Sequence, residues 1–368
     1  MNRRQALAAF AALGFLPDLV RADASTPVSL IGAAWRGPKP DAPYFAGILA
    51  ADWAAEKLSI RYAVPLPTRP HGIVAEAGGG LLVLGVRPGT WLLRCDGDGR
   101  VIRHENLDGS TTRLGGHAIA IGDRLYTTET DVRTGHGKVG VRDLITLAKL
   151  DEWDTHGIDP HQLVADGQGR LLVANGGISR TIPGDRKHNL ERMASSLVRL
   201  DGNDGRLTDQ WRLDDPRLSL RHLAWSHDPA RGDAWLGVAL QAEHDDPAAR
   251  ATAPLLAVLD RGILSLPTRA NDGIGYAGDI ASAAGGFVLS SNQAGLALFW
   301  HPGARDRLAP VVKLKESYAL ASWPGPGGDR GLLLATALGL VRWQAAGTAR
   351  FLPWPEPMAL DNHWVLAG

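Results

Sequence analysis

Five of the twelve histidines stand at the same position of a recurring apolar segment. The segments read HGIVA from His71, HAIAI from His117, HQLVA from His161, HLAWS from His222 and HWVLA from His363. Neutral imidazole is a preferred ligand of zinc, copper and iron. If the fold brings these side chains together, they can bind a metal ion. Because clustered imidazoles cannot all be charged, we also expect their pKa values to fall.

Two further segments share the pattern without the histidine, GDIAS from Gly278 and YALAS from Tyr318. Each of the six segments that start at positions 71, 117, 161, 222, 278 and 318 begins a unit of four short strands separated by turns rich in Gly and Asp. The units are spaced by 40 to 61 residues. Four strands at this spacing are typical of the blades of a β-propeller.

A seventh unit is divided between the two ends of the chain. HWVLAG (363–368) has the pattern of an innermost strand, and residues 28–35, 44–52 and 57–64 supply three more strands. The sequence therefore predicts an all-β fold over residues 25–368, a seven-bladed propeller closed by N- and C-terminal strands that share one blade. Because innermost strands line the central channel, we expect the five imidazoles to surround one mouth of it.

The predicted loops between second and third strands reach the same face and are polar. They cover residues 129–138, 175–195 and 240–254. Glu129 and Asp131 are candidate acidic partners of a metal held by the histidines. Arg69 and Arg221 come just before two of the histidines and could hold an anion or a carboxylate. The alternative is structural: channel histidines that bind ordered water, and charged side chains that pair between blades.

The overall composition excludes several function classes. The 368 residues include 39 basic and 39 acidic side chains, which argues against a nucleic-acid surface or a polybasic membrane patch. The single Cys95 excludes a disulfide scaffold, an iron–sulfur cluster and a CxxC zinc site. No P-loop, GxSxG, HExxH or CxxCH motif occurs. No segment of the mature chain is long and apolar enough to enter a membrane.

Residues 1–24 are predicted to be a signal peptide. Arg3 and Arg4 precede an alanine-rich apolar run, and Ala22-Asp23-Ala24 fits a cleavage site. Paired arginines before a mildly apolar run resemble a twin-arginine export signal. We therefore expect the mature protein in the periplasm, exported by the twin-arginine route.

Four segments carry a resemblance to a known family: GGHAIA…LYTTETD (115–131), HGIDPHQLVADGQGRLLVANGGI (156–178), NLERMASSLVRLD (189–201) and LSLRHLA (218–224). They resemble an exported bacterial family of unknown function. The resemblance implies a seven-bladed propeller with a twin-arginine signal, found near imelysin-type iron-uptake proteins. It implies a periplasmic role close to iron or another metal.

The leading hypothesis is a periplasmic metal-binding propeller that takes part in iron or copper uptake. The candidate metal ligands or their immediate neighbours are His71, His117, His161, His222, His363, Glu129 and Asp131. Its partners would be an iron or copper ion and other periplasmic iron-uptake proteins. Two alternatives stay open: an interaction scaffold without metal, and a metal-dependent hydrolase or oxidoreductase.

Overall fold

A computed structural model describes residues 28–367, apart from 40, 183, 229–232, 269–272, 314–315, 325–329 and 346. The predicted signal peptide, residues 1–24, lies outside the described residues. Among the residues described, no helix has the length and apolar character needed to cross a membrane.

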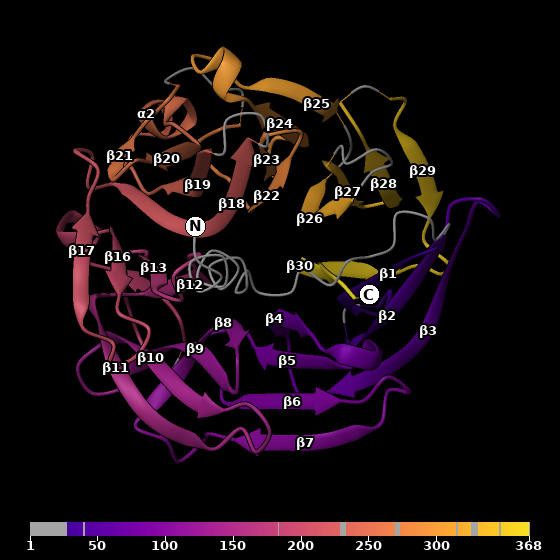
Figure 1. Cartoon of the computed structure of the whole chain (residues 1–368), viewed down its shortest axis with the longest axis horizontal. Coiled ribbons are helices and arrows are strands. Elements are labelled where there is room, and N and C mark those ends of the chain that lie inside the picture. Colours follow the sequence, from indigo (N-terminus) through magenta and orange to yellow (C-terminus); the bar gives the residue numbers. More distant parts are fainter. Residues whose placement is uncertain are drawn as a thin grey trace, which may run out of the picture.

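Seven four-stranded antiparallel sheets stand around a common axis (Figure 1). Six of them are continuous in sequence. Their strands are β4 (Pro70–Ala75), β5 (Leu81–Gly85), β6 (Trp91–Cys95) and β7 (Val101–Asn106); β8 (Thr112–Ile121), β9 (Arg124–Asp131), β10 (His136–Asp143) and β11 (Lys149–Ile158); β12 (Pro160–Ala165), β13 (Leu171–Asn175), β16 (Ser196–Leu200) and β17 (Leu207–Trp211); β18 (Leu218–Asp228), β19 (Asp233–Ala242), β20 (Leu256–Asp260) and β21 (Ile263–Ser265); β22 (Asp279–Ala283), β23 (Gly286–Ser291), β24 (Leu296–Trp300) and β25 (Ala309–Lys313); and β26 (Ser317–Pro324), β27 (Arg330–Thr336), β28 (Gly339–Trp343) and β29 (Arg350–Pro353).

The seventh sheet joins the two ends of the chain. It contains β1 (Val28–Arg36), β2 (Tyr44–Asp52), β3 (Lys57–Leu66) and the C-terminal β30 (Ala359–Leu366). β1 pairs with β30 in the register Ile31↔Leu366 and Gly32↔Val365. The predicted seven-bladed propeller and its shared blade are confirmed. Because β30 also contacts the innermost strands β26 and β4, the ring of blades is closed.

The core is divided among the blade interfaces. The described residues form seven buried apolar clusters, each built from two adjacent blades. Leu84 of one blade, for example, shares a cluster with Leu114 and Leu125 of the next. Burying one leucine side chain contributes about 1.5–3 kcal/mol. Apolar packing between adjacent blades thus stabilises the ring of blades. The central axis is lined by polar side chains instead.

The pairing between innermost and second strands is interrupted at the candidate histidines. In all five blades that carry one, the register shifts around it, as between Pro70 and Ile73 at His71. Such a bulge leaves a residue unpaired and redirects its side chain. The bulge also lets some innermost strands start before the histidine: β8 begins at Thr112 and β18 at Leu218.

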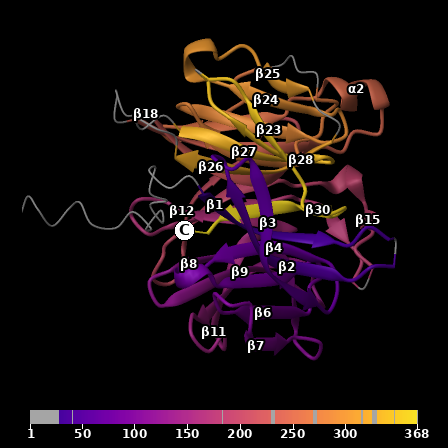
Figure 2. The ribbon, with the colours of Figure 1, turned by 90° about the vertical axis from the view of Figure 1, so that its right-hand side faces the viewer.

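All three predicted long loops contain regular structure. Residues 175–195 include the hairpin of β14 (Ser179–Arg180) and β15 (Lys187–His188), and residues 240–254 include the helix α2 (Pro247–Thr252). The third, 129–138, is mostly strand. Figure 2 shows the β15 segment projecting from one face of the molecule. Short 3₁₀ turns complete the elements, at Ala77–Gly79, Leu190–Arg192 and Pro302–Ala304.

Candidate metal centre

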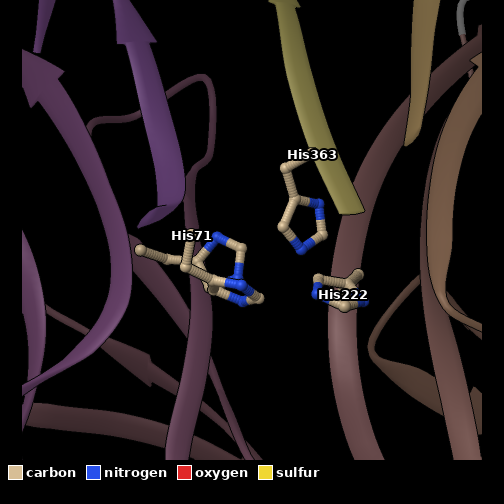
Figure 3. A group of neighbouring side chains, drawn as sticks. His71, His222 and His363 are labelled. Atoms are coloured by element: carbon tan, nitrogen blue, oxygen red, sulfur yellow. The ribbon is translucent and has the colours of Figure 1, made fainter. Parts of the chain in front are cut away.

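Five imidazoles meet between the innermost strands. They come from five consecutive blades, whose innermost strands are β30, β4, β8, β12 and β18. Neighbouring ring centroids are 4.6 Å apart for His363–His71, 4.7 Å for His71–His117, 4.9 Å for His117–His161, 4.4 Å for His161–His222 and 4.5 Å for His222–His363. We call these five residues the histidine cluster. Figure 3 shows three of them, His71, His222 and His363, approaching one another from separate strands.

The histidine cluster is buried, with 3% to 9% of each residue exposed. Burial disfavours the imidazolium form because the charge loses its hydration. This desolvation, together with the neighbouring imidazoles, lowers the pKa of His71, His117, His161 and His222 well below 6.5. These four side chains are therefore neutral at pH 7, the state in which an imidazole can bind a metal.

Four members of the cluster form a group with the spacing of a metal site. His71, His117, His222 and His363 offer ligand atoms that all lie within 4.8 Å of one another. Each has one buried ring nitrogen without a hydrogen-bond partner among the described residues, Nδ1 in His71 and His222, Nε2 in His117 and His363. Buried polar atoms are normally paired. Four unpaired nitrogens in one group are consistent with a site for an ion.

The group is also close to the size that an ion requires. Bonds between a transition metal and imidazole nitrogen are about 2.0–2.1 Å, so two ligand nitrogens lie about 3.4 Å apart around a tetrahedral ion. In square-planar or octahedral geometry, two nitrogens on opposite sides of the ion lie about 4.2 Å apart. The observed limit of 4.8 Å exceeds this by less than one ångström. Small rotations of the side chains would close the difference. The residues present therefore fit a metal ion.

His161 differs from the other four because it already has two partners. Nη1 of Arg87 lies 2.9 Å from Nδ1 of His161. A guanidinium only donates hydrogen bonds, so Nδ1 accepts and the proton of the neutral imidazole is on Nε2. That Nε2 lies 2.8 Å from Nε2 of His222, to which it donates. His161 therefore presents an N–H group to its neighbour, and the neutral His222, whose Nε2 accepts, carries its own proton on Nδ1 as long as this hydrogen bond persists.

A carboxylate orients His363 from outside the cluster. Oδ1 of Asp279 lies 3.5 Å from Nδ1 of His363. A proton on Nδ1 is favoured beside the carboxylate, which leaves the Nε2 lone pair free for an ion, as in carboxylate–histidine–metal arrangements. Asp279 is 6% exposed and is held by the backbone N–H groups of Ile280 and Leu320. The sequence prediction missed it, although it directly follows Gly278, where a histidine is lacking.

Glu129 is not part of the four-histidine group. Its Oε1 accepts hydrogen bonds from Thr127 and from Nη2 of Arg142, each at 2.8 Å. Its Oε2 is 2.8 Å from Nζ of Lys149 and also accepts from Thr112. Burial tends to raise the pKa of Glu129, but Arg142 and Lys149 outweigh it and the pKa is lowered. The carboxylate is satisfied inside its own blade, because β9 extends to Asp131 and no loop begins at Glu129.

Asp131 closes a turn and also lies outside the four-histidine group. Its Oδ1 accepts from the backbone N–H groups of Arg133 and Thr134 and from the Thr134 hydroxyl. These hydrogen bonds, those from Thr134 first, lower the pKa of Asp131. The residue therefore shapes the β9–β10 turn.

The two arginines beside the histidines both hold carboxylates. Nε of Arg69 is 2.8 Å from Oδ2 of Asp361, and Nη1 of Arg221 is 2.9 Å from Oδ2 of Asp159. Arg69 and Asp361 lie on different blades, so this pair links neighbouring blades as the structural alternative expected.

The chain belongs to DUF1513, a family of proteins of unknown function, whose sequence profile matches residues 64–367. Bulged innermost strands and the histidine cluster both lie within that range. A search of curated proteins found no match.

Several solved structures share the fold at low sequence identity. Hydrazine synthase from Kuenenia stuttgartiensis is 13% identical with a TM-score of 0.54, over 87% of this chain and 96% of that one. A putative 6-phosphogluconolactonase from Bacteroides uniformis ATCC 8492 is 12% identical with a TM-score of 0.57, over 92% and 97%. The WD40 propeller domain of Doa1 is 10% identical with a TM-score of 0.52, over 88% and 98%. At these identities the likeness concerns the fold alone.

Proposed function

We propose that this DUF1513 protein is a metal-binding propeller that holds one transition metal ion in its histidine cluster. The observation that supports this most strongly is the group of four buried histidines, each with an unpaired ring nitrogen. A nitrogen-only set of neutral imidazoles favours iron, copper or zinc over calcium or magnesium, which prefer oxygen ligands.

We further propose that the ion is iron or copper and that the protein handles it in the periplasm during uptake. The paired Arg3 and Arg4 and the apolar run behind them support export by the twin-arginine route. That route would deliver the propeller already folded, with its buried site assembled. Its partners would be other periplasmic proteins of iron uptake.

Metal titration of the purified mature chain tests the binding. We expect one equivalent of Fe²⁺, Cu²⁺ or Zn²⁺ to bind, and Ca²⁺ to bind at least 100-fold more weakly. His117→Ala removes one member of the four-histidine group and should weaken binding about 100-fold. His104→Ala is the matched control, because His104 lies exposed on the outer strand β7.

Comparing the metal affinities of wild type and the two variants shows whether the histidine cluster is a metal site or only a structural feature. Equal affinity for wild type, His117→Ala and His104→Ala would contradict the proposal, as would the absence of any tight equivalent in the wild type. Circular dichroism spectra of the three proteins establish that the comparison is made between folded chains.

A further inference from the structure

A cavity of about 270 Å³ lies beside the histidine cluster, where several innermost strands begin. Its wall comes from the segment after β5, the β9–β10 turn, the residues before β12 and the β14–β15 hairpin. Arg87 belongs to this wall and also donates to Nδ1 of His161. The cavity and the histidine cluster therefore share a side chain.

Basic side chains outnumber acidic ones around the cavity. Arg113 donates only to backbone carbonyls, and the exposed Arg133 has no ion pair among the described residues. Neither guanidinium therefore forms an ion pair with a carboxylate of the part of the chain that the structure describes. The charged lining consists of Arg87, Arg113, Arg133 and Arg180 against Asp159 and Asp185.

The inner end of the cavity has an excess of buried positive charge. Asp159 is contacted by Nε of Arg180 at 3.0 Å and by Nη1 of Arg221 at 2.9 Å, and Nη1 of Arg87 is 3.6 Å away. Burial tends to raise the pKa of Asp159, but the guanidinium groups outweigh it and lower the pKa. Asp185 pairs with Arg87 and Arg180. Three guanidinium groups thus share two carboxylates.

Two of these guanidinium groups keep buried donors without partners. The side chain of Arg180 is 9% exposed, and its Nη2 has no hydrogen-bond partner among the described residues. The side chain of Arg221 is 1% exposed, and the same holds for its Nε and Nη2. Leaving a charged donor buried and unpaired is costly. Arg180 lines the cavity, and because its Nη2 is covered, an acceptor bound there reaches this donor once the guanidinium turns.

We propose that this cavity is a binding site for a small oxyanion that carries carboxylate or phosphate groups. The planar donor fork of arginine matches both groups, and four arginines are among the residues that line the cavity. The volume suits a compact anion and is too small for most drug-sized ligands. The site differs in position and chemistry from the histidine cluster, because it offers hydrogen-bond donors and not metal ligands.

The shared Arg87 links the anion to the metal, a consequence that rests on the proposed function. When an anion accepts the hydrogen bonds of Arg87, Arg87 no longer donates to Nδ1 of His161. The proton of His161 is then no longer confined to Nε2. His161 is then free to accept a hydrogen bond from His222 or to turn its own lone pair inward. We therefore expect the anion to strengthen metal binding, and the metal to strengthen anion binding by the same factor.

Calorimetric titration of the metal-free protein tests the anion site by itself. Metal is removed with an immobilised chelating resin, because soluble chelators are themselves polycarboxylates. Citrate, inorganic phosphate and sulfate are titrated separately at low salt, so the preferred anion shows which group the cavity recognises. We expect binding of citrate or phosphate that weakens at 0.5 M NaCl through screening.

Arginine variants locate the binding to the cavity. Arg180→Gln should weaken binding of the preferred anion at least tenfold. Arg133→Gln, at an exposed position where the substitution leaves folding intact, should weaken it at least threefold. Arg103→Gln on the outer strand β7 makes the same charge change on the exposed outer surface and should have no effect. Absence of binding by all three anions, or equal weakening in all three variants, would overturn the proposal.

Metal titrations with and without the preferred anion test the link, once the metal bound by the free anion has been measured without protein and subtracted. In wild type the anion should raise metal affinity about tenfold, and in Arg87→Met the metal affinity should no longer respond to it. An anion that binds without any metal binding would refute the proposed function and leave the anion site standing. Metal binding without anion binding would refute the anion site alone.

Discussion

Two buried polar regions of this propeller differ in how their atoms are partnered. Around Glu129, both carboxylate oxygens are bound by Arg142, Lys149 and two threonine hydroxyls. In the histidine cluster, four residues that are also buried keep a ring nitrogen without a hydrogen-bond partner among the described residues. Burial alone therefore does not distinguish a structural ion pair from a binding site. The two regions differ in whether their buried polar atoms have hydrogen-bond partners. The first region is complete as folded, and the second has ring nitrogens that the proposed metal ion would bind.

The largest effect should come from breaking the complete region. Glu129→Ala leaves Arg142, whose side chain is 2% exposed, as an uncompensated buried charge. Removing one partner of such a pair costs about 3–5 kcal/mol. Urea denaturation should show this loss, while the folded variant still binds one metal ion. Glu56→Ala, in the exposed pair with Arg350, is the control and should cost less than about 1 kcal/mol.

Removing part of the histidine cluster should have a smaller effect on the metal-free protein. The double substitution His71→Ala and His117→Ala deletes two side chains with unpaired nitrogens, so little hydrogen bonding is lost. We expect the free energy of unfolding to change by no more than about 2 kcal/mol in urea denaturation. A loss as large as that of Glu129→Ala would show that the cluster is structural and would remove the contrast between the two regions.

The carboxylate behind His363 should influence metal affinity by a moderate amount. Asp279→Asn keeps the shape of the side chain but removes the charge that favours a proton on Nδ1 of His363. Substitutions of this kind typically weaken metal binding by 10–100-fold, and we expect a value near 10-fold, or about 1.4 kcal/mol. Metal titration measures it. Unchanged affinity would mean that Asp279 does not orient a ligand.

The smallest effect expected is a pH dependence of the metal-free protein. The pKa values of four cluster histidines are lowered from 6.5 in the folded state, so the unfolded chain binds more protons below about pH 6.5. Stability is therefore fully present above pH 6.5 and declines as the pH falls. Urea midpoints at pH 7.5 and 6.0 should show a decline that is about 1 kcal/mol smaller in the single variant His117→Ala, because one histidine with a lowered pKa is removed. An identical decline in both proteins would assign the acid sensitivity to other groups.

Much of the fold follows from the sequence because a propeller repeats its pattern. The strand–turn–strand runs predict the blades, and the phase shared by HGIVA and HWVLA places His71 and His363 at the same depth although 292 positions separate them. The same phase predicts the convergence of all five imidazoles. Repetition thus replaces the long-range information that a single sequence normally lacks.

The chemical partners could not be predicted in the same way. Glu129 and Asp131 follow a predicted second strand, and the sequence does not show that the strand continues through them and turns Glu129 into the blade. The hydrogen bond from Arg87 to His161 joins different blades and has no repeating pattern. Asp279 stands one position after the expected histidine, where the register does not shift and the side chain reaches His363 from outside.

Elemental analysis of the protein exported through its own N-terminal segment tests the central claim most directly. The wild-type chain recovered from the periplasm should hold one equivalent of iron or copper. The His71→Ala and His117→Ala double variant, folded to the same extent, should hold less than a tenth of that amount. An equal metal content in the two proteins, or none in either, would contradict the account.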